Sequence, residues 1–564
     1  MDKVLAACRL VTGSQSEVVD NPADTAGNTD DGDVEEEGAA LSARASPDRM
    51  SEAEARKQPD SPLFEKAAHE EVGSLWENGT WVPVPHGKVP MNAKVIDTML
   101  IFDRKRDQNG KVERHKARNV GKGFLQVAGR DYTEKWAPVV RQATLRTLLA
   151  LAASKDLHME QMDIKTAFLN GTLKEELYVR QPKGFERGDP TQLCRLVKAI
   201  YGLKQAAREW YLAFINALSA AGFARSAADP CLLCKKNGDG MVYILVYVED
   251  LLVVGPTAAD VKAAKAVVSG HFKARDMGEP KWFLGMHIIR DRAAGTITLS
   301  QRQYATTVVE RYGMGDANPK MLPMPVSSRL QREVTALEGA NKAAYPEMIG
   351  ALLYLATSTR PDIAYAVARL DRYTAAPTEA HRALLKGVLR YVKGTQNWGL
   401  TYGRDVPLTG YTDADFAGDL DTRRSTTGFV FTLNGPAVAW ASKAQATVAA
   451  STTEAEYIAA ALGAREALWL AQLLRDVGAP AAGSVQMYGD NQAALTLIKN
   501  PMSVNRCKHI DIAYHFVRDR VERGELLMEH IPTAEMVADV LTKALPSPAL
   551  AMCCLGMGLG PSTS

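Results

Sequence analysis

Two neighbouring carboxylates, Glu249 and Asp250, interrupt the longest apolar run of this sequence, between 241 and 255. The flanking segments, 242–248 and 251–254, are rich in β-branched and other apolar residues, as buried strands are. The pattern predicts a β-hairpin with both acids at its turn. Two adjacent carboxylates beside buried strands repel each other and are costly to desolvate unless a divalent cation neutralises them. A cation site is therefore the first hypothesis, and a solvated acidic turn is the simpler alternative.

A third carboxylate, Asp163, stands near the end of segment 157–164, where apolar and polar residues alternate as in a half-buried strand. The preceding segment, 144–154, has the leucine spacing of an amphipathic helix. An acid at a strand end either caps a helix or holds something positive, and taken alone the cap is the more common role. The hairpin acids favour the second interpretation.

Four more acids stand in the last third of the sequence: Asp413, Glu456, Asp490 and Asp539. Strands are predicted at 408–411, 428–433, 437–441, 485–488 and 526–531. Helices are predicted at 452–474, from Gln492 and around Asp539. Glu456 has a simpler role open to it, because it has the spacing of a helix capping box with Thr453. Asp415 and Glu454 are neighbouring candidates for the same positions.

The composition is that of an ordinary globular protein. The 564 residues carry 67 Lys and Arg against 65 Asp and Glu, for a net charge of +2, which excludes collagen-like, mucin-like and wholly disordered chains. Segment 17–37 holds nine acids and no Lys or Arg, and such a segment buries too little apolar surface to fold. Segment 104–122 holds eight basic residues, which suits a polyanion, although a solvated charged hairpin is the usual alternative.

Nothing in the sequence indicates a membrane or a secretory pathway. No uninterrupted apolar run approaches the roughly 20 residues of a membrane helix, and the residues before position 11 lack the apolar core of a signal peptide. The seven cysteines are scattered, unlike those of a secreted disulfide framework. We therefore expect an intracellular chain without membrane contact.

Several long motifs resemble one known family. They are Q-M-D-I-K-T-A-F-L-N-G around Asp163, Y-G-L-K-Q-A-A-R-E-W-Y from Tyr201 and Y-V-E-D-L-L around Glu249. With W-A-P-V-V from Trp136 and T-R-P-D-I-A-Y from Thr359, they resemble the reverse transcriptase of copia-type retrotransposons, in order and spacing. The resemblance runs from about residue 62 to 546.

The resemblance implies an α+β multidomain fold, a right-hand polymerase followed by a ribonuclease H-like α/β domain. The expected parts are a disordered acidic N-terminal tail at 1–61, fingers and palm of the reverse transcriptase at 62–335, thumb or connection at 336–404, the ribonuclease H-like domain at 405–550 and a C-terminal tail at 551–564.

For the polymerase, the resemblance implies two Mg²⁺ ions held by Asp163 with Glu249 and Asp250, with Mn²⁺ as an alternative ion. Such ions activate the primer hydroxyl and neutralise the triphosphate. The resemblance also implies four nucleotide-binding residues: Lys116 and Arg118 on the triphosphate, Phe168 under the sugar and Gln205 in the pocket. From the residues alone, a surface cation pair, a core aromatic and a polar loop residue are the simpler interpretations.

For the C-terminal third, the order of the predicted elements is that of the ribonuclease H fold. The resemblance makes Asp413, Glu456, Asp490 and Asp539 a metal-binding quartet for two Mg²⁺ ions, which would direct a water at an RNA phosphate. His509 and His515 lie in a block of the same family, where a role in product release competes with that of a satisfied structural histidine.

This chain departs from the family at one principal ligand, because family members have Asp at the position of Glu249. The longer side chain moves the carboxylate outward by about 1.5 Å, whereas in-line attack tolerates errors of about 0.5 Å. We therefore expect polymerase activity to be reduced or absent. Asn119, Gly121 and Ala207 also differ from the usual motif residues, Leu, Ala and Pro.

The sequence thus predicts an RNA-directed DNA polymerase with a ribonuclease H. Its partners would be RNA or DNA template with primer, deoxynucleoside triphosphates and RNA–DNA hybrid, bound through salt-sensitive contacts. The expected location is the cytoplasm, in a virus-like particle, or the nucleus. Two further hypotheses stay open, a chain active only as ribonuclease H and an inactive nucleic-acid-binding remnant.

Overall fold

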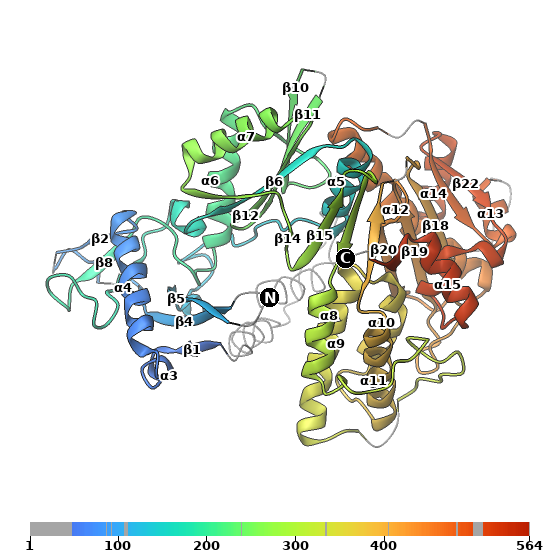
Figure 1. The fold of residues 1–564 in the computed structure, drawn as a ribbon, viewed down its shortest axis with the longest axis horizontal. Coiled ribbons are helices and arrows are strands. Elements are labelled where there is room, and N and C mark those ends of the chain that lie inside the picture. Colours follow the sequence, from blue (N-terminus) through green and yellow to red (C-terminus); the bar gives the residue numbers. More distant parts are fainter. Residues whose placement is uncertain are drawn as a thin grey trace.

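The computed structural model describes residues 48–562 except 86, 92, 107–110, 239, 333–335, 404, 481–482 and 500–510. Helices and strands form a mixed α/β assembly of several modules, with the sheet of the first strands in a lobe at one end of the long axis and the sheet around β18 towards the other (Figure 1). The α+β multidomain prediction is confirmed at this level. Among the described helices, none has the length and hydropathy of a membrane span.

The N-terminal sheet has three strands, in the order β1 (Arg49–Ser51), β4 (Thr98–Arg106) and β5 (Val112–Gly121). The short helix α3 (Glu52–Ala55) follows β1, and α4 (Ser61–Glu77) packs against β5. Phe64 of α4 is 1% exposed and meets the ring of Phe102 edge to face. An apolar stripe on α4 therefore covers one face of this sheet.

The prediction of a disordered tail over residues 1–61 was wrong for its last part. Residues 48–61 are folded, and β1 pairs with β4 of the N-terminal sheet. Arg106 forms an ion pair with Asp48 at 2.7 Å, and Arg104 one with Asp60 at 2.6 Å. Acids of the predicted tail thus pair with two basic residues of the hairpin that the sequence suggested for a polyanion. Residues 1–47 lie outside the described residues.

The central sheet carries the first set of predicted site acids. Its strands, in order, are β13 (Ala274–Gly278), β6 (His158–Ile164), β12 (Asp250–Gly255), β11 (Gly240–Tyr247), β10 (Leu232–Asn237) and β9 (Ala224–Arg225). The helices α6 (Ala206–Ala220) and α7 (Ala258–His271) pack on it. A separate small sheet has the order β2 (Trp81–Pro83), β8 (Leu193–Leu196), β7 (Tyr178–Arg180) and β3 (Val95–Ile96). The predicted strand at 157–164 is confirmed, and so is the predicted hairpin, except that Asp250 lies on β12 and not in the turn.

The connecting sheet joins segments that the sequence assigned to three different parts. Its order is β14 (Trp282–Phe283), β15 (Met286–Asp291), β16 (Thr296–Ser300), β17 (Trp398–Tyr402) and β23 (Leu559–Pro561). The helices beside it are α8 (Arg302–Arg311), α9 (Gly339–Ser358), α10 (Ala364–Asp371) and α11 (Glu379–Gly394), with the 3₁₀ turn η3 (Pro361–Ile363).

The predicted C-terminal tail, 551–564, was wrong where the structure describes it. Helix α15 (Ser547–Gly556) buries Cys553 and Cys554, and β23 pairs with β17 so that Leu559 lies opposite Leu400. Burial of these apolar side chains stabilises the end of the chain against the connecting sheet. The predicted boundary between 335 and 336 is likewise crossed by this sheet, since β16 and β17 are direct neighbours.

The C-terminal sheet has the order β20 (Ala437–Ala444), β19 (Thr426–Thr432), β18 (Thr409–Ala414), β21 (Val485–Gly489) and β22 (Leu526–His530). The first three strands are antiparallel, and β21 and β22 run parallel to β18. Helices α12 (Thr452–Asp476), α13 (Gln492–Lys499) and α14 (Asp511–Glu522) accompany it. The strands and helices predicted for this region are confirmed, except that Asp539 lies in a 3₁₀ helix, η6 (Val537–Leu541).

Helix α5 (Gln142–Ser154) is buried from Ala143 to Ala153, so the prediction of an amphipathic helix with a solvent face was wrong. The helix packs against β16, β17 and β20. Its Arg146 donates to the carbonyl oxygens of Val438 at 2.7 Å and Ser358 at 2.8 Å and lies 3.9 Å from the Trp440 ring centre. The face of α5 that the sequence predicts to be exposed to solvent therefore packs against the C-terminal sheet.

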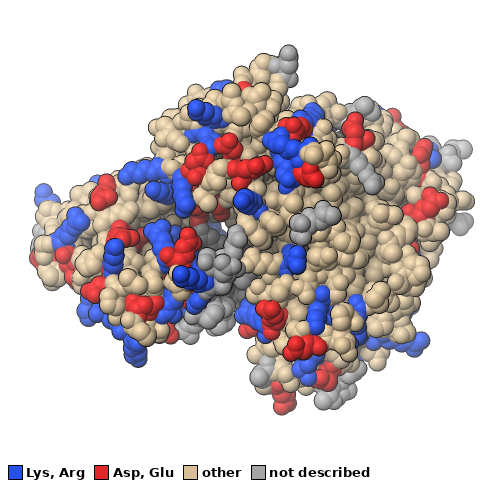
Figure 2. All heavy atoms as spheres, in the orientation of Figure 1, with Lys and Arg blue, Asp and Glu red and all other residues tan. Residues whose placement is uncertain are grey.

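Charged side chains are unevenly spread over the face in Figure 2. Most Lys and Arg visible there lie over the lobe of the N-terminal sheet and the middle of the molecule, interspersed with Asp and Glu. The lobe of the C-terminal sheet shows few charges on this side. This face therefore has no broad patch of a single sign.

The departure at Asn119 leaves a buried amide without a hydrogen-bond partner among the described residues, and we expect its replacement to stabilise the protein. Asn119 is fully buried on β5, and its amide oxygen and nitrogen have no hydrogen-bond partner among the described residues. An unsatisfied buried amide costs about 1–3 kcal/mol. Asn119→Leu should therefore raise the free energy of unfolding by about 1–2 kcal/mol, measured from the midpoint of urea unfolding.

A matched replacement should act in the opposite direction. Asn434 is also buried, but its amide donates to Ala150 O at 3.2 Å and Ser154 Oγ at 2.9 Å, and its φ is +53°. Asn434→Leu removes both hydrogen bonds and strains the backbone, so it should destabilise the protein. Equal effects of the two replacements would contradict the assignment of Asn119 as unsatisfied.

Candidate active sites

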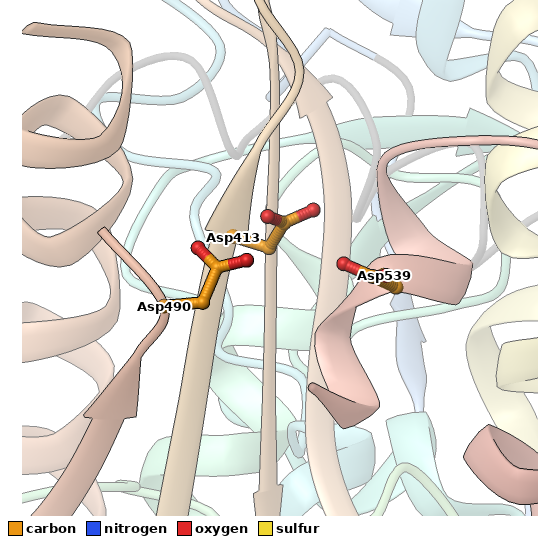
Figure 3. A group of neighbouring side chains, drawn as sticks. All are labelled: Asp413, Asp490 and Asp539. Atoms are coloured by element: carbon orange, nitrogen blue, oxygen red, sulfur yellow. The ribbon is translucent and has the colours of Figure 1, made fainter. Parts of the chain in front are cut away.

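Three aspartates meet at one end of the C-terminal sheet (Figure 3). Asp413 lies on β18, Asp490 directly follows β21, and Asp539 lies on η6, which packs against β18 and β19. Because β18 and β21 are parallel neighbours, with Tyr411 opposite Tyr488, their carboxyl ends lie side by side. The sheet order therefore brings together acids that are far apart in the sequence.

The three carboxylates are close enough to share a cation. One ligand oxygen from each of Asp413, Asp490 and Asp539 lies within 4.8 Å of the others. Asp413 is 2% exposed and Asp539 8%. Thr542 donates its hydroxyl to Asp413, and Thr533 donates to Asp490 Oδ2 at 2.8 Å. These hydroxyls hold the carboxylates in place.

Glu456 on helix α12 lies outside the group of three within 4.8 Å, but it is near enough for the charges of Asp413 and Asp490 to raise its pKa. Its predicted simpler role as a helix cap was wrong. The N-cap is Ser451, whose hydroxyl accepts from Glu454 N at 3.1 Å, while the Glu454 carboxylate accepts from Ala450 N at 2.8 Å. The first helical turn thus uses Glu454. Glu456 instead accepts a hydrogen bond from the Ala414 backbone, beside Asp413.

Asp415 and His515 have surroundings of their own. Asp415 accepts a hydrogen bond from Thr426 N, and burial raises its pKa although Arg369 and Arg372 oppose the rise. His515 is exposed on α14, and its role stays a prediction. His509 lies outside the described residues.

Burial and neighbouring negative charges raise the pKa values of three of these acids, Asp413, Glu456 and Asp539. Burial, with the charges of Asp413 and Asp490, raises the pKa of Glu456 to about 9. Burial and the charge of Asp413 raise the pKa of Asp539 to about 7. Burial, with Asp490, also raises the pKa of Asp413. Like charges in a shared, poorly solvated space cannot all ionise without a cation.

These carboxylates fit the Mg²⁺ that the resemblance implied. Carboxylate oxygens are the ligands that Mg²⁺ prefers, and the raised pKa values of Glu456 and Asp539 indicate that the nearby positive charge does not balance the negative charges of the group. Asp413, Glu456, Asp490 and Asp539 would hold the ions.

The sequence interpretation missed one charged residue of this site. Lys543, one helical turn after Asp539, places Nζ 2.8 Å from Asp539 Oδ1 and 3.9 Å from Asp413 Oδ2. Its spacing of four residues from Asp539 is the signal that could have indicated it. The site therefore contains an ammonium group as well as four acids.

The raised pKa values predict that metal-free protein loses stability as the pH rises. Glu456 ionises near 4.5 in the unfolded chain but near 9 in the folded protein, and Asp539 near 3.8 and 7. Folding binds protons in this range, so the free energy of unfolding falls from pH 4.5 towards pH 9. Thermal unfolding in EDTA should show a falling midpoint over this range, and Mg²⁺ should reverse the trend. In Glu456→Gln the slope should be shallower, and a midpoint that rises with pH in EDTA would contradict the assignment.

The acids of the central sheet lie at the hairpin between β11 and β12. Asp250 on β12 is directly opposite Asp163 on β6, so both side chains lie on the same face of the sheet. Like charges directly opposite each other destabilise a strand pair. This pair is therefore a second place where a cation would stabilise the fold.

The hairpin turn that carries Glu249 is strained and fixed from both sides. Val248 has φ +53°, a conformation that β-branched residues rarely adopt. Trp210 Nε1 donates to Val248 O at 2.8 Å, and Ile164 N donates to Glu249 O at 2.8 Å. Glu249 is 9% exposed. The backbone at Glu249 therefore has little room to shift.

The predicted ligand set Asp163, Glu249 and Asp250 does not converge as the C-terminal acids do. Within the part of the chain that the structure describes, Asp413, Asp490 and Asp539 are the group of three whose ligand atoms lie within 4.8 Å. The role of the three hairpin acids as metal ligands stays a prediction.

Two of the residues predicted to bind nucleotide, Phe168 and Arg118, contact the same aromatic residue, Tyr201, and Asp163 is near enough to Tyr201 for its charge to act on the tyrosine. The Phe168 ring meets Tyr201 edge to face at 4.8 Å, and the Arg118 guanidinium lies 5.8 Å from the Tyr201 ring centre. Burial raises the pKa of Tyr201, and Asp163 adds to that rise. Tyr201 is thus a site residue that the sequence interpretation did not single out.

Arg118 and Gln205 are bound within the protein. Arg118 is 8% exposed and donates to Asp103 Oδ2 at 2.6 Å. Gln205 is fully buried, accepts from Gln126 Nε2 at 3.0 Å and donates to Asp131 O at 3.1 Å. The structure therefore does not place Gln205 on a pocket wall as predicted, because its amide holds the loop before Asp131. Lys116 lies two residues before Arg118 on β5.

Comparison with known proteins decides the family. The family model described as reverse transcriptase (RNA-dependent DNA polymerase) matches residues 78–326. Over 89% of its length, the chain is 41% identical to the retrovirus-related Pol polyprotein from transposon TNT 1-94 of Nicotiana tabacum. A putative transposon Ty5-1 protein of Saccharomyces cerevisiae is 35% identical over 98% of its own length and 53% of this chain. This chain belongs to the copia-type reverse transcriptase family.

The copia-type reverse transcriptase domain contains the first set of site residues, because Asp163, Glu249 and Asp250 lie within the matched range. The four C-terminal acids lie beyond residue 326, outside that model. The Pol polyprotein from transposon RE1 of Arabidopsis thaliana is 38% identical over 86% of this chain. The chain spans 38% of the tobacco polyprotein and 33% of the Arabidopsis one.

Proposed function

We propose that this chain is an RNA-directed DNA polymerase that also carries a ribonuclease H, with both reactions dependent on Mg²⁺. The observation that carries the nuclease assignment is the meeting of Asp413, Asp490 and Asp539 within 4.8 Å at the carboxyl ends of parallel strands. The substrates would be a template with primer, deoxynucleoside triphosphates and the RNA strand of an RNA–DNA hybrid.

The C-terminal residues support a hydrolytic role. When bound, two Mg²⁺ ions would supply an activated water and charge stabilisation at the leaving oxygen. Asp413, fixed by Thr542, and Asp490, fixed by Thr533, would orient the reacting groups. Glu456, on α12, would complete the ligand set.

The polymerase would use Asp163 and Asp250 across the paired strands β6 and β12. Phe168, packed on Tyr201, would lie beneath the sugar of the incoming nucleotide. Lys116 and Arg118 on β5 would face the triphosphate, with Arg118 released from Asp103. Glu249 would hold its ligand position poorly, so polymerisation would be slow.

A nuclease with an inert polymerase is the second candidate. It is favoured by one difference, because the C-terminal aspartates converge whereas the three hairpin acids form no such group in the described residues. An inactive nucleic-acid-binding remnant would bind the hybrid without cutting it.

The deciding experiment offers the full chain a hybrid with labelled RNA, the same RNA alone, and duplex DNA. In Mg²⁺ the RNA of the hybrid should be cut, while the RNA alone and duplex DNA should stay intact, and EDTA should stop the reaction. Primer extension on an RNA template in the same buffer reports the polymerase. An uncut hybrid that the chain still binds would contradict the nuclease assignment.

A further inference from the structure

The C-terminal acids face a cation that belongs to the chain. Lys543 Nζ lies 2.8 Å from Asp539 Oδ1 and 3.9 Å from Asp413 Oδ2. Both aspartates belong to the group of three whose oxygens lie within 4.8 Å. The ammonium therefore lies between two of the carboxylates that would hold a divalent ion.

Lys543 differs from its partners in its access to water. Its side chain is 41% exposed, whereas the side chains of Asp413 and Asp539 are 3% and 11% exposed. The adjacent Thr542 donates to Asp413, which anchors the end of η6 independently of the lysine. The flexible four-carbon stem of a lysine lets its ammonium move into water while the backbone stays in place.

An ammonium and a divalent cation cannot share this position, because at a separation of about 4 Å their repulsion is several kcal/mol even in a medium with an effective dielectric constant near 20. Binding of a metal between Asp413 and Asp539 must therefore displace Lys543. We propose that Lys543 is an internal counter-cation that stabilises the metal-free acids and lowers their affinity for Mg²⁺.

The functional consequence of this inference rests on the proposed nuclease function, whereas its test measures Mg²⁺ binding without substrate and does not depend on nuclease activity. As a positioning residue, Lys543 holds Asp413 and Asp539 in the metal-free protein. It would keep the nuclease sparsely loaded until a nucleic-acid phosphate, which also binds Mg²⁺, adds its charge to the site.

The test measures Mg²⁺ binding to the full chain by isothermal titration calorimetry, without substrate, for the parent and Lys543→Met. The variant should bind Mg²⁺ about tenfold more tightly, equivalent to ~1.4 kcal/mol. In EDTA its thermal midpoint should be lower than that of the parent, and Mg²⁺ should raise it by more. Lys543→Arg retains the charge and should bind Mg²⁺ within about twofold of the parent.

The matched control is Lys262→Met, the same change at an exposed position on α7, which should leave Mg²⁺ affinity and both midpoints unchanged. Unchanged or weaker Mg²⁺ binding by Lys543→Met would overturn the proposal. If Lys543→Met folds poorly, Lys543→Gln gives the same comparison with a polar side chain.

The outcomes separate this inference from the proposed function. Tighter Mg²⁺ binding by Lys543→Met in a chain that leaves hybrid uncut would support the counter-cation and reject the nuclease. Unaltered Mg²⁺ binding in a chain that cuts hybrid would do the reverse.

Discussion

Replacing Asp490 by Asn should lower the rate of hybrid cleavage by about a thousandfold, a loss of ~4 kcal/mol of transition-state stabilisation. Asp490 contributes one of three ligand oxygens that lie within 4.8 Å of one another. An amide is a weak ligand for Mg²⁺ compared with a carboxylate. The loss should appear in single-turnover cleavage of a labelled hybrid.

The fold should tolerate Asp490→Asn. Asp490 is half-buried, and the amide oxygen of Asn can still accept the hydrogen bond from Thr533. The replacement also removes a negative charge that raises the pKa of Asp413 and Glu456. The thermal midpoint in EDTA should therefore be equal to or above that of the parent.

Asp405→Asn is the matched control, because Asp405 is exposed and precedes β18. It should leave cleavage within about twofold of the parent. Cleavage that survives Asp490→Asn would remove the C-terminal acids from the reaction and leave the nuclease assignment without support.

Restoring Asp at position 249 should increase primer extension about ten- to a hundredfold, or ~1.4–2.7 kcal/mol. The hydrogen bond from Ile164 N to Glu249 O, 2.8 Å long, fixes the backbone, and the strained Val248 precedes it. The backbone of the turn therefore cannot shift to compensate for the extra methylene of the Glu249 side chain. Glu249→Asp shortens the side chain without changing its charge, so the carboxylate should move towards the face shared by Asp163 and Asp250.

The measurement is the rate of single-nucleotide addition on an RNA template with Mg²⁺. Glu249→Gln serves as the paired control, since it keeps the length of Glu but removes the charge, and it should not gain activity. Hybrid cleavage should be the same in all three proteins, because Glu249 lies in the β11–β12 turn of the central sheet, whereas Asp413 lies on β18 of the C-terminal sheet. No gain in Glu249→Asp would show that the hairpin is not what limits polymerisation.

Local sequence patterns correctly predicted strands of the central sheet and of the C-terminal sheet. The alternation at 157–164 and the paired apolar runs on either side of Glu249 became β6, β11 and β12. The strand predictions of the last third likewise matched the C-terminal sheet. These patterns depend on which residues face a buried layer, and that information is local.

Patterns failed where packing partners came from distant segments. Helix α5 has the spacing of a one-faced helix, but β16, β17 and β20 cover it. The last residues have no strand pattern strong enough to separate them from a tail, yet β23 pairs with β17. Arg118 has the charge to bind a triphosphate, but in the structure its guanidinium donates a hydrogen bond to Asp103. Asp103 lies on β4, directly opposite Lys116 of β5.

Side-chain type and short periodicity are local properties, and they were enough to predict the acids of both candidate sites and the strands and helices beside them. Which of those acids meet depends on the packing of distant segments. The parallel pairing of β18 with β21 and the packing of η6 bring together Asp413, Asp490 and Asp539. They also place Lys543 among these acids, because contacts between residues far apart in a chain depend on how its elements pack and not on any one segment.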